Sequence, residues 1–269
     1  RPLTLEGGIE GDINIILTKN NHQINNGILK GSLKQPNPKN RVDLTNQKVF
    51  LLNSWSGSSH PALPAFSIEP DNGGVKLWVH IPTIAERITP GNSLDNLLQK
   101  TGDAHCLGDR WLPLLPDNLT KASKFEIGKD SDAITAILDI NSDGFIIDWE
   151  FVLSKINPTT NISNDELKLI SERKPKARLI PKSLKSLKDD INDIQTLIYA
   201  SKLLVNSEKE LGYIELDLPI PKIDKLGDLI YQDPSSEWNQ WKLPLKFHET
   251  NSVISPLIRA VNRSWLDHI

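Results

Sequence analysis

Residues 133–156 read AITAILDINSDGFIIDWEFVLSKI and predict a long β-hairpin. Two runs rich in β-branched and aromatic residues flank NSDG, a group of turn formers at residues 141–144. Upstream, VKLWVHI at 75–81 alternates apolar and polar residues, which is typical of another strand in the same sheet. The centre of the chain is therefore expected to be a β-sheet.

The second half of the chain predicts helices. DDINDIQTLIYASKLLVNSEKELG, residues 189–212, repeats its apolar residues at a spacing near 3.6 and ends at Gly212, a typical helix stop. Its predicted apolar side consists of Ile191, Ile194, Leu197, Ile198, Tyr199, Leu203 and Leu204. Shorter helices are predicted at 164–172, at 251–269 and at 93–102, the last with Ser93 as N-cap. Strands followed by helices indicate an α+β fold.

The first 40 residues predict a separate small layer. DINIILTKNN (12–21) and GILKGSL (27–33) are short apolar runs around turn formers, which favours a β-rich, barrel-like segment. KQPNPKN (34–40) is typical of a linker. We therefore expect a β-rich N-terminal segment at 1–40 and a larger domain at 41–269.

Composition narrows the possible functions. The charged fraction is 24% and the single cysteine is Cys106, which excludes an intrachain disulfide and a thiolate-rich zinc site. No apolar run approaches the about 18 residues that span a bilayer, and no signal peptide is visible, so we expect a cytoplasmic protein without a membrane partner. The net charge of −3 gives no overall support to nucleic-acid binding, so such support has to be local.

Six blocks of the sequence, in order, resemble the catalytic domain of the ribonuclease II and ribonuclease R (RNB) family. They are RVDLTNQKVF (41–50), FSIEPDNGGVKLWVHIPTIAERITPGNSLD (66–95), CLGDRWLPLLPDNLT (106–120), DGFIIDWEFVLSKINPTTNISNDEL (143–167), GYIELDLPIPKI (212–223) and NSVISPLIRAVN (251–262). The resemblance implies the front part of an RNB-type catalytic domain. It also implies a family activity, magnesium-dependent 3′→5′ exoribonuclease.

The resemblance places the family's four metal-binding aspartates in a stretch that has no acid. Residues 53–65 read NSWSGSSHPALPA, and the aspartate positions fall on Asn53 and on or near Pro61, Leu63 and Pro64. Magnesium is held by carboxylates, which none of these residues carries. The chain is therefore predicted to have no catalytic residues and no metal cofactor, with magnesium expected only if the family chemistry is retained.

A basic segment at 173–188, RKPKARLIPKSLKSLK, contains cations and no acid. It could follow a phosphate backbone or dock on an acidic protein, or it could simply be a solvated loop between helices. Trp55 lies among Ser and Gly and is predicted to contact RNA or a partner, whereas Trp78 and Trp149 are expected in the core and His80 is expected to be structural. The predicted binding residues are Trp55, Arg173, Lys174, Lys176, Arg178, Lys182, Lys185 and Lys188.

Three hypotheses for function follow. The leading one is a catalytically degenerate ribonuclease II-like protein that binds single-stranded RNA or an RNA-processing protein of decay or translation. The first alternative is an active exoribonuclease of which this methionine-free chain is an incomplete part. The second alternative is a scaffold subunit of a larger assembly, without RNA contact. The sequence predicts no oligomeric state.

Overall fold

The computed structural model describes residue 15 and residues 33–53, 62–71, 73–103, 105–106, 111–112, 114–174, 179–214 and 249–269. A seven-stranded sheet forms its centre, in the order β1-β8-β7-β4-β3-β2-β9. Its strands are β1 (Val42–Asp43), β2 (Phe50–Leu52), β3 (Ala65–Asp71), β4 (Gly74–Pro82), β7 (Ser131–Ile140), β8 (Ile146–Ile156) and β9 (Thr160–Ile162). Neighbours from β2 to β8 in this order pair antiparallel, whereas β1 joins β8 and β9 joins β2 in parallel.

The predicted hairpin is confirmed as β7 and β8. In its turn, the side-chain oxygen of Asn141 accepts hydrogen bonds from the backbone N–H groups of Asp143 (3.1 Å) and Phe145 (2.9 Å). Gly144 has φ +84°, and a Cβ at this position would lie 2.1 Å from the carbonyl oxygen of Leu203. Only glycine therefore allows the hairpin tip to pack against the long helix that follows in the chain.

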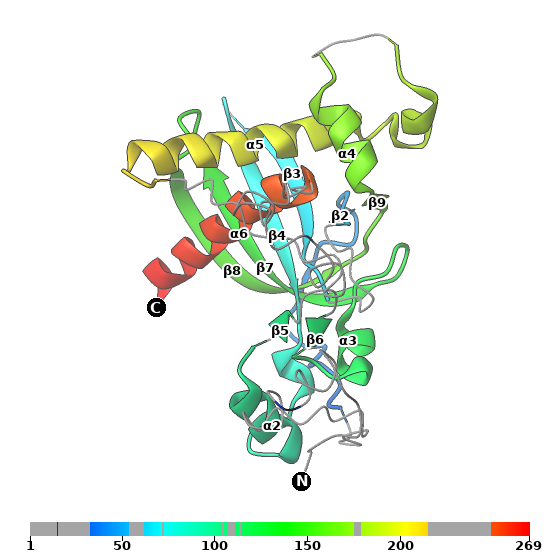
Figure 1. Cartoon of the computed structure of the whole chain (residues 1–269), viewed down its shortest axis with the longest axis vertical. Helices are drawn as coiled ribbons and strands as arrows, with labels where there is room; N and C mark the ends of the chain where they lie inside the picture. The colour runs from blue at the N-terminus through cyan, green and yellow to red at the C-terminus, as the bar shows by residue number, and fades with distance from the viewer. Residues whose placement is uncertain are drawn as a thin grey trace, which may run out of the picture.

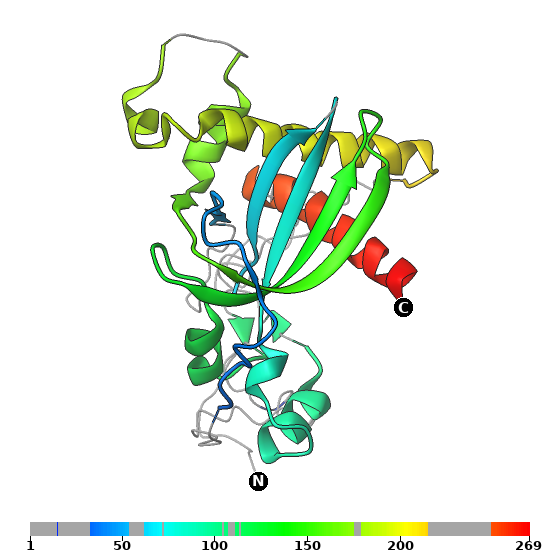
Figure 2. The ribbon, with the colours of Figure 1, turned by 180° about the vertical axis from the view of Figure 1, so that it is seen from behind.

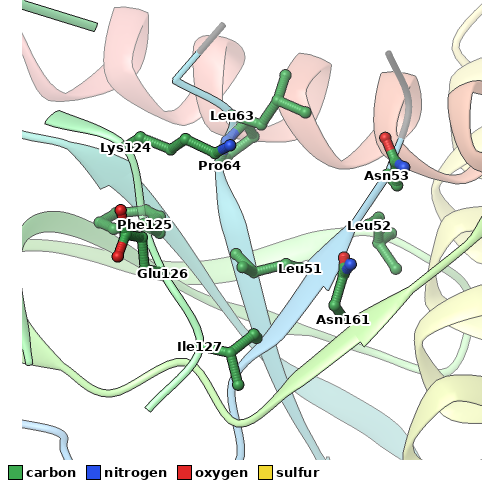
Figure 3. A pocket seen from close by; sticks show the side chains of 10 residues that line it. All are labelled: Leu51, Leu52, Asn53, Leu63, Pro64, Lys124, Phe125, Glu126, Ile127 and Asn161. Atoms are coloured by element: carbon green, nitrogen blue, oxygen red, sulfur yellow. The ribbon is translucent and has the colours of Figure 1, made fainter. Parts of the chain in front are cut away.

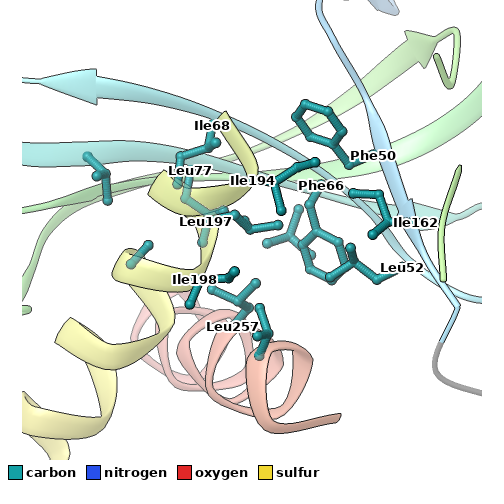
Figure 4. Close-up of a cluster of buried hydrophobic side chains, with 14 of the residues drawn as sticks. Phe50, Leu52, Phe66, Ile68, Leu77, Ile162, Ile194, Leu197, Ile198 and Leu257 are labelled. Atoms are coloured by element: carbon teal, nitrogen blue, oxygen red, sulfur yellow. The ribbon is translucent and has the colours of Figure 1, made fainter. Parts of the chain in front are cut away.

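Three helices cover one face of the sheet: α4 (Asn164–Ser171), α5 (Ile191–Glu210) and α6 (Glu249–His268). Figure 1 shows α5 and α6 crossing in front of the strands, and the opposite view in Figure 2 shows both behind them. Phe66, Leu77, Leu197 and Leu257 are fully buried between the two layers (Figure 4). This is the main hydrophobic core, and the apolar periodicity of the sequence predicted its helical side.

Smaller elements complete the described chain. They are η1 (Ala85–Arg87), α2 (Ser93–Thr101), β5 (His105–Cys106), β6 (Trp111–Leu112), α3 (Asp117–Ser123) and η2 (Lys182–Leu187), where η marks a 3-10 helix. None of the helices that the structure describes is long and apolar enough to cross a membrane. Residues 33–40 are the part of the predicted N-terminal segment that the structure describes continuously, and they contain no strand. The strands predicted at 12–21 and 27–33 lie outside the described residues, except for Ile15 and Leu33.

Two details of the sequence prediction are wrong. The N-cap of α2 is Asn92, whose side chain accepts a hydrogen bond from the backbone N–H of Asp95, because the helix begins at Ser93, one residue earlier than predicted. Tyr199 is 48% exposed, whereas its neighbours Ile198 and Ala200 are buried. In α5 a third of each turn faces away from the sheet, and an amphipathic tyrosine is tolerated there.

Candidate functional site

A pocket of ≈ 370 Å³ opens where β2 and β9 meet the segment that follows α3. Figure 3 shows Asn53 and Asn161 on one side of it and Phe125 with Glu126 on the other. Leu63 and Pro64 come from the residues just before β3. The lining consists of Leu51, Leu52, Asn53, Leu63, Pro64, Lys124, Phe125, Glu126, Ile127 and Asn161.

Strand register fixes the floor of this pocket. Leu51 is paired with Asn161 on the parallel strand β9 and with Ala65 on the antiparallel strand β3, so these side chains project from the same face. At the end of β2, the backbone N–H of Asn53 donates to the carbonyl oxygen of Ile162 at 2.9 Å. The backbone bond holds Asn53 at the rim, where its side chain is exposed.

The carboxylate at the pocket is already paired. Glu126 is its one acidic lining residue, and it accepts a hydrogen bond from the ammonium group of Lys129. That bond, together with the charges of Lys129 and Lys124, lowers the pKa of Glu126. Asn53 and Asn161 offer neutral amides. The pocket therefore presents apolar walls, two amides, the ammonium group of Lys124 and one carboxylate that is paired with Lys129.

This set of donors does not fit the magnesium ion that the family resemblance implies. Mg²⁺ prefers an octahedral shell of carboxylate and water oxygens, and two amides do not supply the charge that such a site needs. Three of the predicted degenerate positions, Asn53, Leu63 and Pro64, do converge on the pocket. Pro61 and Trp55 lie outside the described residues. The described residues contain no group of three or more His, Cys, Asp or Glu able to hold a metal.

A buried polar chain crosses the sheet beside this site, and sequence reasoning found only its histidine. Nε2 of His80 lies 3.0 Å from Oγ of Ser67, and its Nδ1 lies 2.8 Å from Oγ1 of Thr135, which is 2.6 Å from Oγ of Ser154. All four side chains are buried, and this burial lowers the pKa of His80 to about 3. His80 is thus a neutral, structural residue, as predicted.

Arg41 anchors the start of the sheet, a role that the sequence prediction missed. Its side chain is 4% exposed and contacts Glu86 at 2.6 Å and Asp132 at 3.1 Å. One guanidinium nitrogen also donates to the carbonyl oxygens of Ala133 and Ser154, both at 3.3 Å. The arginine therefore joins β1, η1, β7 and β8. Its Nε also donates to the nearby carbonyl oxygen of Asn37 at 2.9 Å. No local pattern could reveal the role in the sheet, because its partners on η1, β7 and β8 lie 45 or more residues away.

The basic segment is ordered where the structure describes it. Lys182, Lys185 and Lys188 are exposed on or next to η2, and Lys174 is exposed as well. Arg173 is half-buried, and its guanidinium donates to the carbonyl oxygen of Leu179 at 3.3 Å. Lys176 and Arg178 lie outside the described residues. The described cations of this segment thus lie near α4 and η2, on other elements than those that form the pocket.

A family profile described as RNB domain matches residues 41–269. Ribonuclease II, chloroplastic/mitochondrial, of Arabidopsis thaliana is 26% identical over 148 residues, which are 49% of this chain and 18% of the relative. RNase R of Mycoplasma genitalium, solved in complex with ribose methylated single-stranded RNA, superposes with a TM-score of 0.63 at 15% identity. That match covers 94% of this chain and 35% of RNase R.

Yeast Ssd1, described as a pseudonuclease, superposes with a TM-score of 0.60 at 17% identity, over 96% of this chain and 31% of Ssd1. The two structural likenesses confirm the predicted α+β fold of the RNB type. The chain spans at most 35% of each of these three proteins.

Proposed function

The chain belongs to the RNB domain family, and on this premise we propose that it is a catalytically degenerate member that binds single-stranded RNA without hydrolysing it. One observation carries the proposal. Asn53, Leu63 and Pro64, three of the four positions that the resemblance assigns to the family's aspartates, line one pocket. Between residues 53 and 65 the sequence has no acid that could replace them.

The pocket lacks the groups that metal-dependent phosphodiester hydrolysis requires. Phosphodiester hydrolysis by this route needs a metal ion that activates a water and neutralises charge on the transition state. The neutral amides of Asn53 and Asn161 and the apolar side chains of Leu63 and Pro64 supply neither function. Glu126 contributes one carboxylate, but Lys129 already neutralises it. What remains is a folded scaffold with a pocket of ≈ 370 Å³ and exposed cations.

Two solved structures support the proposal, one for RNA binding and one for the absence of nuclease activity. RNase R of Mycoplasma genitalium was solved with single-stranded RNA, which supports RNA as the partner. Ssd1 is described as a pseudonuclease, which supports a chain of this fold without nuclease activity. The activity of the whole proteins, of which the matches cover 35% and 31%, is not transferred by these likenesses.

RNA affinity measured with and without magnesium tests the proposal. Fluorescence anisotropy of a labelled single-stranded oligonucleotide should give the same Kd in Mg²⁺ and in a chelator at equal ionic strength, because no described residue set binds the ion. Binding that needs Mg²⁺ would mean that a functional metal site exists, and the first alternative, an active exoribonuclease, would be correct.

The same titration also tests the hypotheses in which the partner is a protein instead of RNA. If the chain binds no RNA in low salt, docking to an RNA-processing protein or a scaffold role takes precedence. The cytoplasmic location expected from the sequence stays a prediction.

A further inference from the structure

We infer that η2, with the lysine that caps it, is a docking site for successive phosphates of single-stranded RNA; this rests on the proposed function, because it locates the RNA. The site consists of Lys182, Lys185 and Lys188. We call these three residues the lysine row. It lies on the segment between α4 and α5, away from the pocket at β2 and β9.

The 3-10 geometry of η2 aligns the row. A 3-10 helix has three residues per turn and rises about 2 Å per residue, so side chains at i and i+3 lie above one another about 6 Å apart. Lys182 and Lys185 have this spacing within η2, and Lys188 continues it. The backbone N–H of Lys188 donates to the carbonyl oxygen of Lys185 at 3.4 Å. An extended sugar-phosphate backbone repeats its charge at a similar interval. A run of lysines on an α-helix would instead turn away from a straight strand.

A second side of η2, a third of a turn from the row, is buried and fixes the orientation of the row. Leu184 is 0% exposed and Leu187 is 4% exposed, and both belong to the main core. Their spacing is again i and i+3, so the leucines hold one side of the 3-10 helix on the protein and the lysines face solvent. The backbone of the row is therefore held on the core, so η2 itself does not have to fold when a ligand binds.

The nearest carboxylates do not neutralise the row. Asp189 follows Lys188 directly and is exposed, and within the described residues no ion pair joins its carboxylate to the row. Asp190 and Asp193 both contact Nζ of Lys48 at 3.0 Å, and Asp190 also accepts a hydrogen bond from the hydroxyl of Thr160. Those bonds raise the pKa of Lys48, with Asp193 as the larger cause. Within the described residues, none of the three lysines of the row has an ion-pair partner. Their charge is available to a ligand.

The chemistry of the row selects phosphates rather than bases. Lysine ammonium groups act as point charges for phosphate oxygens, and such contacts carry no base information. No described aromatic residue belongs to η2, so base stacking does not contribute at this site. We therefore expect binding that depends strongly on salt and only weakly on sequence.

The test compares two triple variants that remove the same charge. In the first, Lys182, Lys185 and Lys188 become Gln. In the control, the exposed lysines Lys39, Lys100 and Lys121 become Gln. The last two belong to α2 and α3, which lie at the opposite end of the molecule from α4 (Figure 1). A labelled, unstructured oligonucleotide is titrated with each protein at several salt concentrations.

The row variant should make the log–log salt slope shallower by about 2, since each single-strand phosphate contact contributes about 0.7. The control should keep the slope of the unchanged protein. Equal slopes in all three proteins would overturn the docking site while leaving RNA binding intact. Absence of RNA binding by the unchanged protein would overturn both this inference and the proposed function.

A second variant keeps the charge and tests the alignment alone. Lys182→Ser, Ser183→Lys, Lys185→Ser and Ser186→Lys together move two lysines by one position, which is a third of a turn of η2. Ser183 and Ser186 are exposed, so the exchange leaves the leucine side untouched. We expect a slope shallower by about 1.4, the contribution of two contacts. Affinity and slope equal to those of the unchanged protein would show that charge alone, and not the row, is recognised.

Discussion

The helix-covered side of the sheet and the pocket at β2 and β9 differ in how closely their residues are packed. On the covered side, Phe66, Leu77 and Leu257 are fully buried. At the pocket, Leu63 and Pro64 are half-buried and Asn53 is exposed. Residues on neighbouring strands of the same sheet thus either stabilise the core or line the pocket. The fold survives changes in the second group because few of its contacts depend on them.

The largest difference is expected from two large-to-small substitutions. Phe66→Ala opens a cavity in the closed core and should lower the unfolding free energy by about 3–5 kcal/mol. Leu63→Ala at the pocket should lower it by about 1 kcal/mol, because solvent already reaches this side chain. Urea unfolding measures both. Similar losses would show that the pocket belongs to the core and would remove the contrast.

Arg41→Ala should have the next largest effect, a loss of about 3 kcal/mol, since it leaves two carboxylates without their buried partner. The matched change at the pocket is Lys129→Ala, which breaks the exposed pair with Glu126. Exposed pairs contribute little, so its melting temperature should stay close to that of the unchanged protein. Thermal unfolding at neutral pH distinguishes the two. A stable Arg41→Ala protein would mean that Glu86 and Asp132 find other partners.

His80 is paired with Ala65, so it projects from the face of the sheet opposite to Phe66, and it makes the stability of the fold depend on pH. Its pKa in the folded protein is about 3 and its ordinary value is 6.5, so below pH 6.5 the unfolded chain binds a proton that the folded chain does not. The stability present above pH 6.5 is therefore lost as the pH falls, by about 2 kcal/mol between pH 7.5 and pH 5. His80→Gln should lack this loss. Parallel stability curves for the two proteins would contradict the buried, neutral histidine.

The smallest effect is expected when aspartates are introduced at the four predicted degenerate positions. Asn53→Asp, Pro61→Asp, Leu63→Asp and Pro64→Asp in one chain should still give no magnesium-dependent RNA cleavage. Metal ligands have to be held to about 0.5 Å, and the stretch from Asn53 to Ala65 is about two residues longer than the family's. Product analysis of an end-labelled RNA measures this. Turnover would show that only the four side chains had been lost.

The sequence predicted the elements better than their contacts. Strong periodicity revealed β7, β8 and α5, and the turn formers at 141–144 placed the hairpin, because local propensity and burial agree in those segments. The row on η2 was predicted as a set of cations, but its alignment depends on a 3-10 geometry that no periodicity indicated. The partners of Arg41 and His80 are far apart in the chain, so only the folded sheet reveals them.

Hydrolysis of an end-labelled, single-stranded RNA is the most direct measurement of whether this chain keeps the RNB scaffold without the RNB chemistry. The protein is incubated with the RNA in Mg²⁺ at a concentration at which anisotropy shows the RNA to be bound. We expect the full-length RNA to remain, because no carboxylate set at Asn53, Leu63 and Pro64 can hold the ion. Progressive shortening from the 3′ end that a chelator abolishes would contradict this and show an active exoribonuclease.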